Sequence, residues 1–175
     1  MDFTININIL TKMLISDLTR WYKENVRNRL PLFGFLALVV VGGLELGLAA
    51  PPDEWFFALA KPAFNPPGWL FAPVWTVLYI LIAVAGSRAW QRNPIGWPMR
   101  IWWLQLFFNF AWSPTFFYYH RIDLALVISV LLLLCILGFI ASSWRQDRIT
   151  AWLFVPYAVW VAFATVLNAS IYSLN

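Results

Sequence analysis

The side chains best suited to chemistry in this sequence are amides and aromatic rings that recur at helical spacing within apolar stretches. Gln105 is followed by Asn109, Trp112 and Phe116 at spacings of four, three and four residues. These spacings place all four side chains on one face of a helix. Amides donate and accept hydrogen bonds and an indole donates them, so this face is predicted to form hydrogen bonds without carrying charge.

Two further stretches offer similar chemistry. One carries four residues at successive intervals of four: Pro156, Trp160, Ala164 and Asn168. The other places Trp75 and Tyr79 four residues apart. Aromatic planes combined with a few neutral polar groups suit a flat apolar ligand with polar edges. The alternative is that Gln105, Asn109 and Asn168 only hold helices together, at about 0.6–2 kcal/mol each.

Conventional catalytic and metal-binding patterns are missing from the sequence. One histidine, His120, and one cysteine, Cys135, lie apart in the chain and do not make a metal site of the usual ligand number. Cys135 lies in the apolar run 131–140 and is interpreted as a small apolar residue. The motifs of serine hydrolases, phosphate-binding loops, zinc proteases and dinucleotide-binding domains do not occur. We therefore expect no metal and no required cofactor.

The composition predicts an integral, multi-pass membrane protein of the all-α class. Of the 175 residues, 62% are hydrophobic and 11% are charged, whereas soluble domains carry about 45–50% apolar and about 25% charged residues. A helix needs about 20 mostly apolar residues to cross a bilayer. Five runs approach this length: 30–50, 69–87, 100–119, 124–143 and 151–173. The sequence therefore predicts a five-transmembrane-helix bundle over residues 30–175.

The basic residues predict how the chain is oriented in the membrane. Ten of the 12 lysines and arginines lie on the side of the N-terminus and of the second and fourth loops: Lys12, Arg20, Lys23, Arg27, Arg29, Arg88, Arg92, Arg100, Arg145 and Arg148. The other side carries only Lys61 and Arg121. Because cytoplasmic loops are rich in Lys and Arg, the N-terminus is predicted to be cytoplasmic. Basic residues scattered at the ends of apolar runs also speak against binding to nucleic acid.

Tryptophans also gather near the ends of the predicted spans, as Trp90, Trp97, Trp102, Trp144 and Trp152. Tryptophan is enriched at the membrane–water interface. These five residues are therefore interpreted as an interfacial belt that needs no functional explanation.

Residues 1–29 form a basic N-terminal extension ahead of the first span. Leu10, Leu14, Leu18 and Trp21 fall on one helical stripe, with basic residues between them. This pattern predicts an amphipathic helix on the membrane surface, with a disordered basic tail as the alternative.

The first loop, residues 51–68, is rich in prolines and aromatic residues and differs from an ordinary solvated connection. Asp53 and Glu54 follow Pro52, and carboxylates there favour the start of a short helix. Pro62 should end that helix, because the residue before a proline, Lys61, avoids the α conformation. We expect a short helix and then an extended strap over the mouth of the bundle, and structured loops of this kind often carry function.

Four blocks of the sequence resemble, in the same order, the translocator proteins, also called tryptophan-rich sensory proteins or peripheral-type benzodiazepine receptors (the TspO/MBR family). The first-loop block reads W-F-F-A-L-A-K-P-A-F-N-P-P-G-W over residues 55–69. The second block reads P-V-W-T-V-L-Y over residues 73–79. The third lies within residues 105–117 and comprises Q-L, Asn109, Trp112 and F-F. The fourth lies within residues 156–168 and comprises P-Y, Trp160, F-A-T and L-N. The likeness runs from about Gly43 to the C-terminus and leaves the N-terminal extension outside it.

The resemblance implies a five-helix bundle, commonly a homodimer, with a pocket open toward the first loop. Members of this family bind porphyrins such as protoporphyrin IX and haem, and some bind sterols, isoquinoline carboxamides or benzodiazepines. Transferred position by position, six residues would bind the ligand: Trp75, Tyr79, Asn109, Trp112, Trp160 and Ala164. Four residues of the first loop would form a lid: Trp55, Lys61, Phe64 and Trp69. Lys61 is interpreted either as the partner of a porphyrin propionate or as an interfacial anchor.

One departure from the family concerns sterols. The animal sterol-recognition pattern needs a basic residue soon after a tyrosine, whereas Tyr172 is followed only by Ser173, Leu174 and Asn175. Sterol binding through this pattern is therefore not expected.

The function implied by the resemblance is that of a membrane receptor or carrier that senses, sequesters or transports tetrapyrroles. The alternative is an enzyme that degrades porphyrin in light and oxygen, an activity linked in the family to two tryptophans that correspond to Trp75 and Trp160. A structural helper of another membrane complex is a third hypothesis. The bacterial inner (plasma) membrane is the first choice of location and the mitochondrial outer membrane the second.

Overall fold

The computed structural model describes residues 12–13, 15–19 and 29–175, and all regular structure in these residues is helical. The helices are α2 (Leu30–Leu36), α3 (Gly42–Ala49), α4 (Glu54–Ala58), α5 (Phe71–Arg92), α6 (Trp97–Ser113), α7 (Ile122–Trp144) and α8 (Arg148–Leu174). A π-helical segment, Ala37–Val41, joins α2 to α3, another, Pro114–Tyr118, continues α6, and a 3₁₀ turn, Gly68–Leu70, leads into α5. From residue 29 onward the described chain thus forms five long helical rods and the short α4, which confirms the predicted all-α class.

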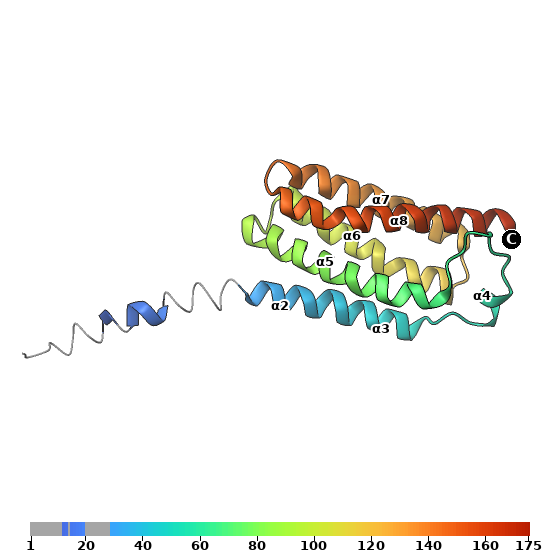
Figure 1. Cartoon of the computed structure of the whole chain (residues 1–175), viewed down its shortest axis with the longest axis horizontal. Coiled ribbons are helices and arrows are strands. Elements are labelled where there is room, and N and C mark those ends of the chain that lie inside the picture. The colour runs from blue at the N-terminus through green and yellow to red at the C-terminus, as the bar shows by residue number, and fades with distance from the viewer. Residues whose placement is uncertain (1–11, 14, 20–28) are drawn as a thin grey trace, which may run out of the picture.

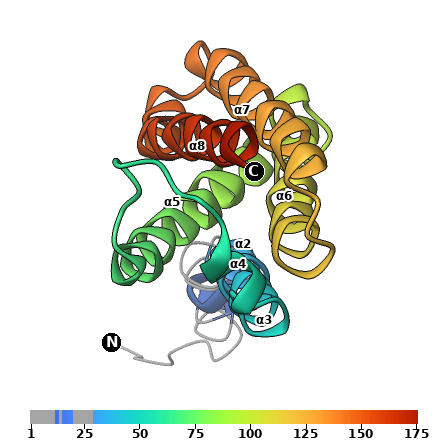
Figure 2. The ribbon, with the colours of Figure 1, turned by 90° about the vertical axis from the view of Figure 1, so that its right-hand side faces the viewer.

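The rods lie side by side and alternate in direction (Figure 1). α2 begins at the end of the bundle where α5 ends and α8 begins, which we call the arginine end after Arg88, Arg92 and Arg148. The other end, called the loop end, holds α4 and the C-terminus. Viewed from the loop end, the first loop runs from α4 toward the C-terminus of α8 and back to the start of α5 (Figure 2). This path confirms the predicted strap across the mouth of the bundle.

Aspartates set where two of the helices begin. Asp53 precedes α4 and accepts a hydrogen bond from Phe56 N at 3.0 Å. Asp147 precedes α8 and accepts one from Ile149 N at 3.1 Å. A carboxylate at this position satisfies an amide group that the first helical turn leaves unpaired. The short helix predicted in the first loop is therefore confirmed.

Four of the rods in the described residues are long and apolar enough to cross a membrane: Leu30–Ala49, Gly68–Arg92, Ile122–Trp144 and Arg148–Leu174. They match four of the five predicted spans to within a few residues at each end. The remaining predicted span, 100–119, is helical as α6 and its π-helical continuation, but it is not one of these four. Tryptophans, Arg100, Gln105 and Asn109 lower the hydropathy of this rod.

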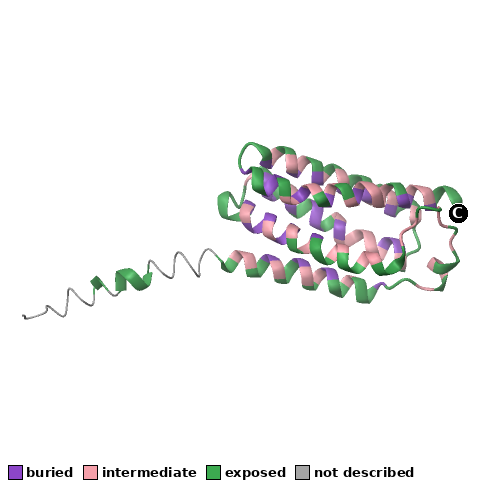
Figure 3. Cartoon of the chain, viewed as in Figure 1, coloured by how far each residue is buried: buried purple, intermediate pink, exposed green. Residues whose placement is uncertain are grey.

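The buried residues follow the inward faces of the rods, and the outward faces are exposed (Figure 3). Large apolar side chains remain on those outward faces, among them Leu44, Leu134 and Val159. An exposed apolar surface of this kind is expected where helices are surrounded by lipid, because lipid tails are as apolar as leucine.

Trp102 of α6 packs against Gly86 of α5. The Trp102 ring is fully buried, and its Nε1 donates a hydrogen bond to Ile82 O at 3.0 Å. A Cβ atom on Gly86 would lie 2.4 Å from Cε2 of that ring, so a glycine is needed there. The interpretation of Trp102 as a belt residue is therefore wrong, because its N–H finds its partner inside the bundle. The other four tryptophans of the predicted belt are exposed: Trp90, Trp97, Trp144 and Trp152.

The predicted amphipathic helix of the N-terminal extension lies mostly outside the described residues, and so do Leu10, Leu14 and Trp21. Residues 12–13 and 15–19 are helical and exposed, Leu18 among them. The amphipathic character of residues 1–29 stays a prediction.

Candidate functional site

Three buried polar side chains form a hydrogen-bonded network between α6 and α8. Asn109 Nδ2 donates to Tyr157 Oη at 2.7 Å, and Tyr157 Oη donates to Gln105 Oε1 at 3.1 Å. An unpaired polar group in an apolar bundle is costly, so these bonds favour one alignment of α6 against α8. The predicted common face of Gln105 and Asn109 is confirmed.

Tyr157 is the member of this network that sequence reasoning missed. The predicted stripe ran through Pro156, which is exposed, whereas the buried face of α8 includes Tyr157, Val161 and Asn168. A signal was present, because Phe154, Tyr157, Val161 and Asn168 recur at spacings of three, four and seven residues. That recurrence has the helical period and marks the buried face better than the strict intervals of four.

A second set of hydrogen bonds lies nearer the loop end. Trp112 Nε1 donates to Asn168 Oδ1 at 3.1 Å, and Asn168 Nδ2 donates to Ile122 O at 3.1 Å. The Trp112 ring also stacks on Phe116, with ring centroids 5.0 Å apart. Asn109 and Asn168 thus both join helices in this structure, as the packing alternative expects.

Aromatic rings from α5 and α8 meet beside the Tyr157 network. The Trp75 ring centroid lies 5.3 Å from that of Tyr79 and 6.2 Å from that of Tyr157. The Trp160 ring centroid lies 5.7 Å from that of Phe71 on α5. Trp75 and Trp160 therefore share the α5–α8 interface, with Tyr79 next to Trp75.

The α2–α3 rod approaches this aromatic group through Gly43. A Cβ atom there would lie 2.2 Å from Cε2 of Tyr79, so the glycine permits the close approach. Ala164, the small residue predicted to bind ligand, is half-buried on α8 one turn after Trp160.

Two buried N–H groups in this region have no hydrogen-bond partner among the described residues: Trp160 Nε1 and Gln105 Nε2. Buried donors are nearly always paired, and leaving one unpaired costs about 1–3 kcal/mol. An indole N–H can only donate, so a group that satisfies Trp160 must supply an acceptor atom. The α5–α8 interface is therefore a candidate site for a ligand that carries acceptors.

The first loop contacts the bundle through aromatic rings. Trp55 lies 5.9 Å from Phe116 between ring centroids. Phe64 lies 6.3 Å from Phe163 of α8. Trp69, in the turn before α5, is exposed. Two of the predicted lid residues, Trp55 and Phe64, thus touch rings of the bundle.

Lys61 organises the first loop itself. Its Nζ donates to Phe56 O at 2.6 Å, to Leu59 O at 3.1 Å and to Phe57 O at 3.3 Å. Basic side chains near a helix C-terminus satisfy the last carbonyl groups, which have no partner within the helix. Lys61 thus closes the C-terminal end of α4, a role that neither interpretation from the sequence anticipated.

The ten predicted ligand and lid residues fall into separate groups. Trp75, Tyr79 and Trp160 pack against the main core, whereas Trp55 and Trp112 pack against a smaller core at the loop end. α8 connects the two cores, because the Trp160 ring centroid lies 5.6 Å from that of Phe163, which packs against the smaller core. Their shared role in binding stays a prediction.

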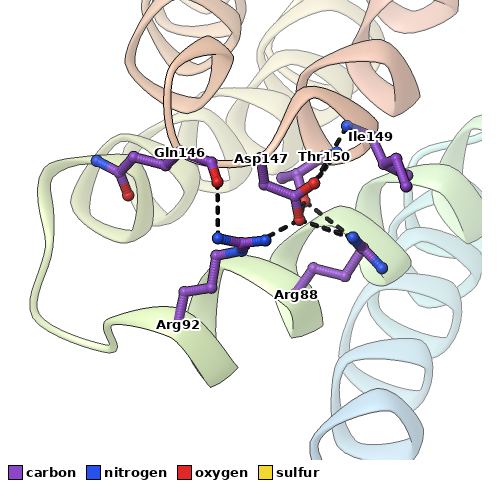
Figure 4. Close-up of polar contacts among 6 residues, drawn as sticks. All are labelled: Arg88, Arg92, Gln146, Asp147, Ile149 and Thr150. Carbon is purple, nitrogen blue, oxygen red and sulfur yellow. Dashed lines mark hydrogen bonds and ion pairs between the residues drawn. The ribbon is translucent and has the colours of Figure 1, made fainter.

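An ionic group at the arginine end was not predicted from the sequence. Asp147 Oδ2 accepts hydrogen bonds from Arg88 Nη2 at 2.7 Å, Thr150 Oγ1 at 2.7 Å and Arg92 Nε at 3.2 Å (Figure 4). Arg92 Nη1 also donates to Gln146 O at 2.6 Å. Burial raises the pKa of Asp147, but hydrogen bonds from Thr150 and Arg88 more than offset this and lower the pKa to about 2. The uneven distribution of Lys and Arg between the two sides of the chain does not by itself predict that Arg88 and Arg92 pair with Asp147.

A small space beside the ionic group has a volume of about 10 Å³, and its lining includes Arg92, Ser143, Gln146 and Asp147. This volume suits about one water molecule and is far too small for a flat organic ligand. The arginine end therefore serves to join α5 to the turn between α7 and α8.

The chemistry available at the α5–α8 interface is stacking on aromatic rings and hydrogen bonding by neutral groups. In residues 12–13, 15–19 and 29–175, no three His, Cys, Asp or Glu side chains are grouped as a metal site would require. An apolar ligand with a few acceptor atoms matches the groups that are present.

Comparison with known proteins identifies the family of this chain. Residues 35–174 match the model of the TspO/MBR family. The chain is 37% identical over 132 residues to the tryptophan-rich sensory protein of Cereibacter sphaeroides, covering 74% of this chain and 82% of that protein. It is 35% identical over 150 residues to the tryptophan-rich protein TspO of Chlorobaculum tepidum, covering 80% and 95%. It is 32% identical over 154 residues to the translocator protein of Bos taurus, covering 83% and 90%. With this match, and with four helices among the described residues that are long and apolar enough to cross a membrane, the chain belongs to the TspO/MBR family of membrane proteins.

Proposed function

We propose that this protein is a membrane receptor or carrier for porphyrins, such as protoporphyrin IX and haem, and for similar flat apolar ligands. The observation that carries the proposal is the buried Nε1 of Trp160, which has no hydrogen-bond partner in the described part of the chain and lies at an interface of aromatic rings. A porphyrin presents a flat apolar face to Trp75 and Trp160, and its propionates supply acceptor atoms. Two relatives are named as a sensory protein and a translocator, which agrees with sensing or transport.

The unpaired N–H of Trp160 makes the empty site less stable than the occupied one. A buried donor without a partner costs roughly 1–3 kcal/mol. A ligand that brings an acceptor recovers this free energy, so the cost to the empty protein becomes a gain in affinity. Replacing the indole by a ring without an N–H removes both together.

Trp160→Phe tests this argument on the purified protein, titrated with protoporphyrin IX in darkness. We expect affinity to fall about tenfold, the equivalent of one hydrogen bond, while the empty protein unfolds at a higher temperature. Trp152→Phe is the matched control, because Trp152 lies on the same helix and is exposed. Unchanged affinity in Trp160→Phe would show that the N–H does not meet the ligand and would remove the main support for the proposal.

The shared interface of Trp75 and Trp160 favours a second candidate, an enzyme that degrades porphyrin in light and oxygen. Electron-rich indoles on both sides of a bound porphyrin suit photooxidative chemistry, whereas stacking alone needs only a ring. The double variant Trp75→Phe, Trp160→Phe keeps both rings. If the protein is an enzyme, the double variant should lose far more porphyrin breakdown under illumination than porphyrin affinity in darkness. If it is only a receptor, the parent protein should show no breakdown beyond the bleaching of free porphyrin.

We also infer that α6 with its continuation crosses the membrane as a fifth span. α6 has 17 residues and its π-helical continuation has five, so together they are nearly as long as the neighbouring α7, which has 23 residues. Gln105, Asn109 and Trp112 form their hydrogen bonds inside the bundle, so these polar groups need not meet lipid. Five spans place the two termini on opposite sides, with the N-terminus cytoplasmic by the charge bias. A C-terminal reporter active in the cytoplasm would contradict this topology.

The location and assembly of the protein follow the same proposal. We place it in a bacterial plasma membrane first and in a mitochondrial outer membrane second, since relatives come from both bacteria and mammals. A homodimer is proposed from the family resemblance, and cross-linking in native membranes is the measurement that tests it.

A further inference from the structure

We propose that His120 and Asp53 form a clasp that holds the first loop over the loop end and that loosens when the imidazole loses its proton. His120 Nε2 and Asp53 Oδ2 lie 2.9 Å apart. Asp53 caps α4 in the first loop, whereas His120 follows the π-helical continuation of α6. The contact therefore joins two separate segments. The inference concerns regulation of the ligand site proposed above, and its functional meaning rests on that proposal.

A stacked aromatic ring adds a second contact to the clasp. The imidazole of His120 lies 4.1 Å from the Trp55 ring, centroid to centroid, with 20° between the planes. Trp55 in turn contacts Phe116, which stacks on Trp112. A protonated imidazole is attracted to an indole face more strongly than a neutral one, by the cation–π interaction. Protonation therefore strengthens a contact that leads directly to predicted ligand and lid residues.

The backbone of His120 indicates that the side chain is held in place. Its φ angle of 53° lies in the left-handed region, and no other non-glycine residue described in the structure has a positive φ. Histidine adopts this region more readily than most residues, but the conformation still costs free energy. Such a conformation persists where contacts of the residue determine it, and here those contacts are with Asp53 and Trp55.

The neighbouring charged groups have their own partners or remain in water. Arg121 Nη2 pairs with Asp123 Oδ2 at 2.7 Å. Lys61 is bound to the carbonyl groups at the end of α4. Glu54, the residue after Asp53, is exposed. Among the described residues, Asp53 is therefore the carboxylate within hydrogen-bond distance of the imidazole.

Asp53 carries its charge throughout the range in which imidazole titrates. A hydrogen bond from Phe56 N lowers the pKa of Asp53, partial burial opposes this, and the contact with His120 lowers it further. Imidazole itself changes charge between about pH 5 and 8. With a protonated imidazole the clasp is an ion pair with a cationic stacked ring, whereas with a neutral imidazole only a hydrogen bond remains.

A second attachment of the first loop does not depend on pH. Asn175 Oδ1 accepts a hydrogen bond from Ala60 N at 3.0 Å, and Asn175 Nδ2 donates to Ala60 O at 3.1 Å. An amide has no charge to lose in this range. When the clasp loosens, α4 can therefore move away from His120 while the strap remains attached at Ala60.

Spin-label distances on the empty protein test the clasp without any porphyrin. One label is placed on α4 by Phe57→Cys and the other on α8 by Tyr172→Cys, both at exposed positions, with Cys135→Ala as background. We expect the population with α4 held down to decrease about two- to fivefold relative to the open one between pH 5 and pH 8, the range typical of exposed ion pairs. Identical distance distributions at the two pH values would overturn the inference.

Two variants remove the charge and spare the local structure. Asp53→Asn keeps the helix cap, and His120→Asn tolerates the left-handed backbone. His120→Asn should abolish the pH dependence. Asp53→Asn should reduce it, because the protonated ring can still stack on Trp55, and this variant carries the test alone if the other does not fold. Asp123→Asn is the control, because it removes a carboxylate that pairs with Arg121 and not with His120, and it should leave the pH dependence intact. If both the Asp53 and the His120 variants keep the full pH dependence of the parent protein, the clasp is contradicted.

The outcome is independent of the proposed ligand. A lid that responds to pH in a protein without porphyrin affinity would refute the proposed function and leave the clasp established. If the protein binds porphyrin but the position of its first loop does not depend on pH, the proposed function stands and the clasp is refuted.

Discussion

Asp147 and Asp53 cap helices at opposite ends of the bundle, and their surroundings differ in a way that explains both ends. The Asp147 side chain is 6% exposed and pairs with Arg88 and Arg92. The Asp53 side chain is 44% exposed and pairs with His120. Arginine stays charged at every pH that a membrane protein meets, whereas histidine does not. The same residue in the same capping position therefore makes a permanent junction at the arginine end and a releasable one at the loop end.

The largest effect should come from removing the permanent junction. Asp147→Ala leaves Arg88 and Arg92 without their carboxylate and removes the cap of α8. We expect the free energy of unfolding to fall by roughly 2–3 kcal/mol, of which about 1 kcal/mol belongs to the cap. Thermal unfolding in detergent measures this, and Asp147→Asn, which keeps the cap, should cost less. A loss no larger than that of Asp53→Ala would break the comparison between the two ends.

Acid should weaken the same junction. Because the pKa of Asp147 is lowered from 3.8 to about 2 in the folded protein, its contribution is complete above about pH 4 and is lost as pH falls toward 2. At about 1.4 kcal/mol for each pKa unit, the contribution is about 2 kcal/mol. Unfolding measured from pH 5 to pH 2 should show this loss in the parent protein and much less of it in Asp147→Asn.

Two glycines extend the comparison from charge to packing. Gly86, two residues before Arg88, meets the buried ring of Trp102, whereas Gly47, near the loop end, has open space around its missing side chain. Gly86→Ala should destabilise the protein by about 1–2 kcal/mol through overpacking. Gly47→Ala should stabilise it by up to about 1 kcal/mol, because alanine favours the helix. Equal effects at the two positions would show that the Trp102 ring does not restrict the side chain at position 86.

The smallest effect on unfolding is expected at the loop end. Asp53→Ala removes the cap of α4 and the clasp with His120, but α4 has no fully buried residue. The free energy of unfolding should therefore fall by no more than about 1 kcal/mol, while proteases cleave the first loop faster. A loss as large as that of Asp147→Ala would mean that the first loop supports the whole bundle.

Much of the fold was predictable because helix formation and hydropathy depend on neighbouring residues. The predicted runs are all helical, the first loop contains the short helix expected after Asp53, and Gln105 and Asn109 share a face. Trp102 was misjudged because its environment depends on Gly86 of another helix. Tyr157 was missed because intervals of four drift away from the buried face of a helix with 3.6 residues per turn.

The membrane class, the approximate ends of the rods, the short helix in the first loop and the neutral chemistry of the inward faces can all be predicted from the amino-acid sequence. Which polar groups find partners depends on the folded arrangement. That arrangement leaves the Trp160 N–H without a partner among the described residues, joins Asp147 to Arg88 across 59 positions of the chain, and sets His120 against Asp53 across 67. The reason is geometric: spans follow from the local run of apolar residues, whereas pairing depends on how each rod is rotated and on where loops distant in sequence meet.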